Sequence, residues 1–174
     1  MGGSETIDIG SGLAGGKMLL LELGSGDRPF EDGRGWTHSD ERVLPDIELV
    51  FDAADPPEDL DGRCQEVRAT HLLEHFSHRD TFKILRRWRR LLTDGGLLYL
   101  EVPNLEQQMR DLMNRARADW ETVRLMYGDQ DYPGNYHKTG FTSRLLKEYL
   151  KESGYRRVEI QDIGLVLNAW AHKP

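Results

Sequence analysis

Two glycines and two aspartates in the first third of the chain have the spacing of a nucleoside-binding site. Gly24 and Gly26 follow a short apolar run, and Asp40 comes 14 residues after Gly26. Glycines at the end of a buried strand let a ligand approach the backbone closely. A carboxylate at Asp40 can accept two hydrogen bonds from a ribose diol. With Asp52 after the next apolar run, the pattern favours a nucleoside cofactor over a plain turn.

The pattern of a dinucleotide-binding loop is incomplete. Pro29 stands where the third glycine is expected, and no start of a phosphate-binding helix follows it. The loop is therefore expected to bind a ligand that has no pyrophosphate. This disfavours NAD and FAD, so a nicotinamide oxidoreductase is only a weak alternative.

A polar, aromatic loop over residues 128–140 contains the candidates for acceptor binding. It includes Asp131, Tyr132, Tyr136, His137 and Lys138. His137 is the natural general base for a hydroxyl acceptor, because imidazole titrates near neutral pH. A histidine bonded to the loop backbone is the alternative. The tyrosines could stack on a sugar or an aromatic acceptor, or pin the loop, and the lysine could pair with an anionic acceptor.

Residues 71–75 have the pattern His-x-x-Glu-His, which also occurs in one class of zinc peptidases. On a helix, His71 and His75 would share a face and could bind zinc, with Glu74 as the base. That site needs a helix of several turns, whereas a strand-like run precedes the motif and Ser77 is expected to cap a new helix. We therefore predict no metal site and keep a zinc hydrolase as a minor alternative.

Apolar periodicity predicts the elements that position these residues. Strands are expected at 17–23, 35–40, 47–53, 65–71, 97–102, 155–161 and 165–172, and helices at 78–92, 105–127 and 142–153. Gly95 and Gly96 are expected to end the first helix, and Thr142 to cap the last one. This order predicts an α/β fold with a mostly parallel sheet that closes with an antiparallel strand pair.

Composition and charge exclude several classes of protein. The 174 residues include 23 Lys and Arg against 30 Asp and Glu, a net charge of −7. This disfavours general nucleic-acid binding, and the basic run 86–90 is expected to be a solvated helix face. The single cysteine, Cys64, excludes an internal disulfide. No apolar run reaches the about 18 residues of a membrane span, and the first residues lack a signal-peptide pattern.

We therefore expect a soluble, cytoplasmic protein with one domain. That domain is predicted over residues 17–174, after a flexible leader over residues 1–16 that is rich in glycine and serine.

Seven segments, taken in order, resemble the class I S-adenosylmethionine-dependent methyltransferases. The nearest resemblance is to a small bacterial, type-11-like kind that is often found near sugar and cell-surface polysaccharide genes. The segments are LLELGSGDRP, WTHSDE, DIELVFDAAD, ATHLLEHF, WRRLLTDGGLLYLEVPN, DYPGNYHKTGFT and LLKEYLKESGYRRVEI, between about Met18 and Lys173. The resemblance implies a Rossmann-like sheet of seven strands, mostly parallel with an antiparallel last strand. It also implies S-adenosyl-L-methionine as the cofactor.

The resemblance implies roles for individual residues. Those implied for the cofactor are Glu22, Gly24, Ser25, Gly26, Asp40, Asp52, Ala53, Thr70 and His71. Asp40 would hold the ribose hydroxyls, and Asp52 with the backbone N–H of Ala53 would border the adenine. The others would lie nearer the methionine part. The family pattern is not complete, because the helix after the first strand is nearly absent and none is expected before that strand.

The combined prediction is a methyltransferase that acts on an oxygen of a small-molecule or sugar-linked acceptor. The motifs of amino-methylating enzymes are absent, and Cys64 is not in a catalytic setting. A catalytically silent nucleoside-binding protein of the same fold is the alternative. Nucleic-acid and membrane partners are not expected, and the oligomeric state is left open.

Overall fold

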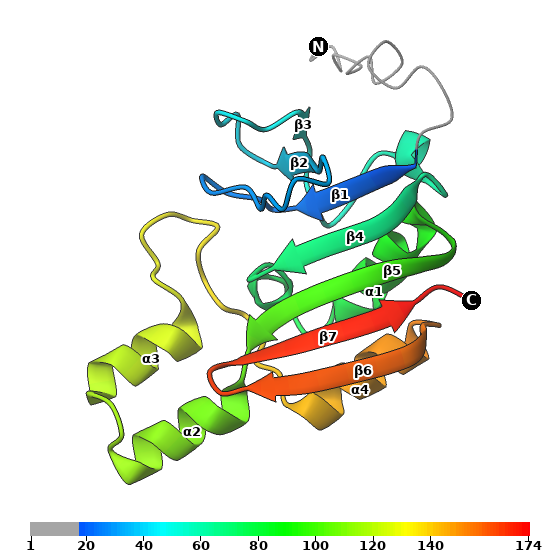
Figure 1. Cartoon of the computed structure of the whole chain (residues 1–174). Helices are drawn as coiled ribbons and strands as arrows, with labels where there is room; N and C mark the ends of the chain where they lie inside the picture. Colours follow the sequence, from blue (N-terminus) through cyan, green and yellow to red (C-terminus); the bar gives the residue numbers. More distant parts are fainter. Residues whose placement is uncertain (1–17) are drawn as a thin grey trace.

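A computed structural model describes residues 18–174, so the predicted leader over residues 1–16 lies outside the described residues (Figure 1). The described chain forms one seven-stranded sheet in the order β3-β2-β1-β4-β5-β7-β6. The strands are β1 (Leu19–Leu23), β2 (Thr37–Asp40), β3 (Leu49–Val50), β4 (Cys64–Thr70), β5 (Leu92–Pro103), β6 (Arg156–Ile163) and β7 (Val166–His172).

The direction of the strands confirms the predicted fold class. Strands β1 to β5 pair in parallel, whereas β7 runs antiparallel to both β5 and β6. The chain leaves β1 toward β2 on one side and later returns to pair β4 on the other. Ligands of open α/β sheets bind beyond the carboxyl ends of the strands at such a reversal of strand order. The expected site therefore lies where β1 and β4 end.

Four α-helices and two short 3-10 turns complete the described chain. They are η1 (Glu58–Leu60), η2 (Leu73–His75), α1 (Thr81–Leu91), α2 (Leu105–Asn114), α3 (Asp119–Tyr127) and α4 (Ser143–Glu152). Figure 1 shows α1 and α4 behind the sheet, with α2 and α3 beyond one end of it. The core fills the space between the sheet and its helices, with Leu21, Leu100, Trp88 and Leu150 fully buried. None of these helices is long and apolar enough to cross a membrane.

The opposite face of the sheet has no helix over it in the described part of the chain (Figure 1). As the spacing predicted, residues 24–36 connect β1 to β2 without a helix. Part of that face is covered instead by the guanidinium of Arg68, which lies 3.8 Å from the ring centroid of Phe30 and 4.4 Å from that of Tyr99. Stacking of a cation on two rings thus replaces part of a helix layer.

Two helix predictions need correction. The first helix begins at Thr81, not at residue 78, and Ser77 does not cap it. It ends at Leu91, because the buried Leu92 turns directly into β5, so Gly95 lies inside that strand with a φ of 74° and is no helix cap. The predicted helix over residues 105–127 is two helices, because Arg115 takes the left-handed conformation and ends α2.

The last helix matches its prediction closely. The hydroxyl of Thr142 accepts a hydrogen bond of 3.2 Å from the backbone N–H of Leu145. This satisfies one of the free N–H groups at the start of α4. Gly154 follows the end of the helix with a φ of 93°, a conformation that favours glycine.

Candidate functional site

A cavity of about 340 Å³ lies at the carboxyl ends of β1, β2 and β4. This volume falls within the range of about 300–1,000 Å³ that is typical of small-molecule sites. The predicted site residues that line it are Gly24, Gly26, Asp40, Asp52, Ala53, His71, Tyr132 and Lys138. Those that do not line it are Glu22, Ser25, Thr70, Asp131, Tyr136 and His137.

The loop after β1 forms one wall of the cavity, and its backbone conformation favours glycine at two positions. Gly24 and Gly26 have φ values of 62° and 64°, which residues with a Cβ rarely adopt. A Cβ on Gly24 would also lie 2.7 Å from Cδ1 of Leu72, which follows β4. The backbone N–H of Ser25 donates to the carbonyl of Ser39, which holds the loop against β2.

Asp40 ends β2 with its carboxylate at the edge of the cavity. One oxygen accepts a 2.9 Å hydrogen bond from the backbone N–H of Gly26. The other accepts from the backbone N–H and from Nε of Arg42, at 3.0 and 2.9 Å. Burial alone would raise the pKa of Asp40, but the hydrogen bonds from Arg42 and Gly26 lower it. The aspartate is therefore ionised. Nη2 of Arg42 also donates to the oxygen that binds Gly26, at 3.4 Å, so the carboxylate accepts four hydrogen bonds in all.

A turn after β3 forms the next part of the wall. Oδ1 of the exposed Asp52 accepts a 2.7 Å hydrogen bond from the backbone N–H of Ala54, which closes the turn. The carbonyl of Ala53 accepts from Nε1 of the fully buried Trp88 at 2.7 Å. Helix α1 therefore holds this turn in place.

The basic run over residues 86–90 is not solvated throughout. Arg87 is buried, and its guanidinium donates to the carboxylate of Asp61 at 2.5 Å and to the carbonyl of Pro56 at 2.6 Å. The prediction of a solvated face is thus wrong for Arg87. This side chain ties α1 to the segment between β3 and β4, next to the turn that carries Asp52.

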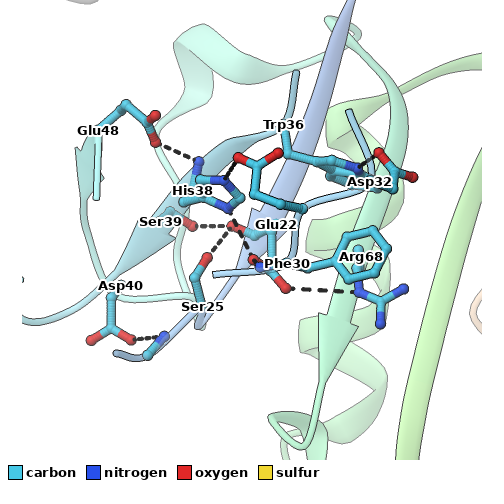
Figure 2. Close-up of polar contacts among 12 residues, drawn as sticks. Glu22, Ser25, Phe30, Asp32, Trp36, His38, Ser39, Asp40, Glu48 and Arg68 are labelled. Carbon is cyan, nitrogen blue, oxygen red and sulfur yellow. Dashed lines mark hydrogen bonds and ion pairs between the residues drawn. The ribbon is translucent and has the colours of Figure 1, made fainter. Parts of the chain in front are cut away.

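Glu22 points away from the cavity, into a buried polar network (Figure 2). It lies between the core residues Leu21 and Leu23, and alternation along a strand directs its side chain to the other face of the sheet. Its carboxylate accepts from the backbone N–H of Phe30 at 2.8 Å and lies 2.9 Å from Nδ1 of His38. The carboxylate thus holds the connection between β1 and β2 at Phe30, and the backbone carbonyl of Glu22 accepts from the hydroxyl of Ser39 in β2 at 2.8 Å.

The segment after β4 does not form the zinc-peptidase arrangement. His71 follows the strand with a φ of 49°, and residues 73–75 make a single 3-10 turn, so His71 and His75 do not share the face of an α-helix. The imidazole of His71 lies 3.2 Å from a carboxylate oxygen of Glu101 and 3.3 Å from one of Glu74. These carboxylates raise the pKa of His71 to about 10.

The loop over residues 128–140 covers one side of the cavity with Tyr132, Gly134 and Lys138. The guanidinium of Arg42 lies 4.8 Å from the ring centroid of Tyr132, which joins this loop to the end of β2. Asp131 accepts a hydrogen bond from the side chain of Asn135 within the loop. Tyr136 is exposed and does not reach the cavity.

His137 lies behind the cavity wall, against His75. The two ring centroids are 5.0 Å apart, and His75 lines the cavity whereas His137 does not. Nδ1 of His137 is 3.1 Å from the carbonyl oxygen of Leu125. Burial lowers the pKa of His137, so its ring is neutral at pH 7.

Several residues of the cavity wall were not among the sequence predictions. They are Glu41, Arg42, Ala54, Leu72, His75, Phe76 and Gly134. Most of them directly follow the carboxyl end of β2, β3 or β4, or the short turn after it. Proximity to a predicted strand end was therefore the available signal, since the carboxyl ends of parallel strands meet at one edge of a sheet.

No family model and no curated protein matches the chain. Solved structures do. The CMeT domain of citrinin polyketide synthase aligns with a TM-score of 0.63 and 16% identity, over 91% of this chain and 48% of that one. This chain therefore spans about half the length of that protein.

Two further structures match over more of their length. An S-adenosylmethionine-dependent methyltransferase from Archaeoglobus fulgidus gives a TM-score of 0.62 and 16% identity, over 90% of this chain and 86% of that one. The 1,6-didemethyltoxoflavin-N1-methyltransferase of Burkholderia thailandensis was solved with S-adenosylhomocysteine. It gives a TM-score of 0.62 and 17% identity, over 89% of this chain and 70% of that one. These likenesses establish the fold as the Rossmann-like methyltransferase fold.

Proposed function

We propose that the chain is an S-adenosyl-L-methionine-dependent methyltransferase. The observation that carries the proposal is Asp40, an ionised acid at the end of β2 whose carboxylate binds the glycine loop at the edge of the cavity. This placement suits recognition of a ribose diol. The likeness of the fold to solved methyltransferases supports the same function.

In this proposal the parts of the cofactor lie one after another along the edge of the sheet. Asp40 would take the ribose hydroxyls in exchange for hydrogen bonds from Arg42, because its carboxylate already accepts four. The turn at Asp52 and Ala53 would border the adenine. Oδ1 of Asp52 binds the N–H of Ala54, which leaves Oδ2 without a hydrogen-bond donor among the described residues. The loop from Gly24 to Gly26 would receive the methionine part, where the glycines leave the backbone accessible.

When bound, the cofactor supplies an electrophilic methyl group, and the protein's main task is then to position the acceptor for an in-line displacement. The loop over residues 128–140 is the part of the wall best placed to do so. Tyr132 and Lys138 line the cavity from this loop and would contact the acceptor. Both side chains suit a hydroxyl-bearing or anionic molecule, such as a sugar-linked acceptor.

For removal of the acceptor proton, His137 stays the predicted base. Its Nε2 carries the free lone pair, because Nδ1 faces the carbonyl of Leu125. His137 does not line the cavity, whereas the neighbouring His75 does, so an acceptor would have to reach past His75 to contact His137. This placement is also the observation that favours the alternative, a protein that binds the cofactor without turnover.

Transfer of a labelled methyl group tests the proposal against that alternative. The protein is incubated with S-adenosylmethionine labelled in its methyl group and with panels of hydroxyl and amine acceptors, including sugars. We expect labelled product from hydroxyl acceptors and a reduced rate for Lys138→Ala, with the exposed Lys147→Ala as the control. Binding of S-adenosylhomocysteine without transfer to any acceptor would support the silent protein instead.

A further inference from the structure

A cluster of metal-binding side chains lies beside the cavity, and it differs from the pattern considered in the sequence. Glu74 and His75 belong to η2, whereas His137 comes from the loop over residues 128–140. One ligand atom from each of these three residues lies within 4.8 Å of the other two. His71, the first histidine of the sequence pattern, is not part of this cluster.

The carboxylate of Glu74 is buried without a hydrogen bond. Glu74 is 1% exposed, and neither of its carboxylate oxygens accepts a hydrogen bond from any of residues 18–174. The neighbouring cation is His71, whose Nδ1 lies 3.3 Å from Oε1. Buried carboxylates are normally hydrogen-bonded, paired, or bound to a metal. Oε1 is thus paired with His71, and a cation among Glu74, His75 and His137 would satisfy the other carboxylate oxygen.

The two histidines are held in the tautomer that binds a metal. Nδ1 of His75 is 3.2 Å from the carbonyl oxygen of Tyr136, and Nδ1 of His137 is 3.1 Å from that of Leu125. A carbonyl oxygen only accepts, so each Nδ1 carries the proton and each Nε2 has a free lone pair. Metal-binding histidines characteristically donate their other ring N–H to a carbonyl or carboxylate in this way.

Backbone hydrogen bonds fix the loop of His137 against η2. The backbone N–H groups of Lys138 and Thr139 both donate to the carbonyl of Glu74, at 2.8 and 3.1 Å. The hydroxyl of Thr139 donates to the carbonyl of Phe76 at 2.7 Å. The three side chains are therefore brought together by the fold, and a ligand would not have to order the loop first.

We propose that Glu74, His75 and His137 bind a divalent transition-metal ion through one carboxylate oxygen and two imidazole nitrogens. Two neutral nitrogens and one carboxylate suit zinc or ferrous iron, with at least one coordination position left open. Zinc–ligand distances of about 2.0–2.2 Å place tetrahedral ligand atoms about 3.3–3.6 Å apart. The ligand atoms, which lie within 4.8 Å of one another, would have to move toward the ion to reach that spacing.

The consequence for catalysis rests on the proposed function. Because His75 lines the cavity, the open coordination position would face the acceptor. A hydroxyl oxygen bound there would have a lowered pKa and would lose its proton more easily. In the metal-bound protein His137 is then a ligand, so it cannot also be the base.

Metal binding is measured on the protein without cofactor or acceptor. The purified chain is first stripped with a chelator and then titrated with zinc in competition with a chromophoric chelator. We expect one equivalent of zinc, and at least tenfold weaker binding in His137→Ala and in Glu74→Gln. His78→Ala, at an exposed histidine, should retain the site.

A second measurement uses cobalt in place of zinc. Four-coordinate cobalt should give a visible absorption band that His137→Ala abolishes. The unfolding midpoints of the metal-free variants show whether each variant still folds. The proposal is overturned if the wild type binds no equivalent of zinc, or if His137→Ala binds as tightly as His78→Ala. Titration of metal-free protein with S-adenosylhomocysteine tests the proposed function separately, so failure of one does not imply failure of the other.

Discussion

The buried carboxylate of Glu22 and the imidazole of His38 join β1 to β2 on the face of the sheet that has no helix over it (Figure 2). Both side chains are less than a tenth exposed. Removing one partner of a buried pair leaves the other charge uncompensated, which costs more than the pair contributes. The network therefore holds together a two-strand connection that a helix would otherwise support.

Replacement of Glu22 should destabilise the fold. We expect Glu22→Ala to lower the free energy of unfolding by about 3–5 kcal/mol, measured by urea denaturation. Glu31→Ala, which removes the exposed partner of His38, should have a much smaller effect. The carboxylate of Glu22 does not line the cavity, so its role is expected to be structural. If Glu22→Ala kept its stability but lost affinity for the cofactor, this structural role would be contradicted.

The same network predicts a dependence of stability on pH. Burial alone would lower the pKa of His38, but the carboxylates of Glu31, Glu22 and Glu48 outweigh it and raise the pKa above its ordinary 6.5. A raised pKa in the folded state means that the stabilisation is complete below pH 6.5 and is lost as the pH rises through the folded value. Unfolding free energies measured from pH 6 upward should fall in the wild type, and His38→Gln should flatten that fall. An equal slope in both proteins would be inconsistent with this assignment.

At the scale of elements, α4 depends on its cap. The hydroxyl of Thr142 binds the N–H of Leu145, and the helix then buries Leu146 and Leu150 against the core. We expect Thr142→Ala to cost about 1 kcal/mol of unfolding free energy, because an N–H at the helix start loses its acceptor. Thr142→Ser keeps the oxygen and serves as the control. Thermal unfolding measures both, and equal losses in the two variants would show that the cap bond is not the cause.

The sequence predicted which strands exist better than where helices end. All seven strands were located, and β1 and most of β5 show the apolar runs expected of buried strands. Strand β2 is polar and is marked only by its place between turn residues, and β5 begins five residues before its predicted start. The end of α1 was missed because Leu92, a good helix former, is buried in β5 from the first residue after the helix. The break between α2 and α3 occurs at Arg115, in a left-handed conformation that no glycine marks.

For the whole molecule, the mostly parallel sheet with its antiparallel closing strands was predicted from the sequence, as was a site at the carboxyl ends of the first strands. The order of the strands in the sheet was not predicted. The side chains that point into the cavity were harder to predict. Leu21 and Glu22 are neighbours in β1, but Leu21 points into the core and Glu22 faces the other side of the sheet. Contacts such as that of His75 with His137 depend on how a loop folds back, which periodicity does not encode.

The proposal of a methyltransferase depends first on cofactor binding, and calorimetric titration with S-adenosylhomocysteine tests it most directly. Wild type, Asp40→Ala and Asp40→Asn are compared with Asp59→Ala, which removes an exposed acid away from the cavity. We predict one binding site, weakened in Asp40→Ala by about 1.5–3 kcal/mol, or about tenfold to 150-fold. Asp59→Ala should bind as the wild type does. If the wild type binds no S-adenosylhomocysteine, or if Asp40→Ala binds it equally well while remaining folded, the proposed cofactor site is wrong.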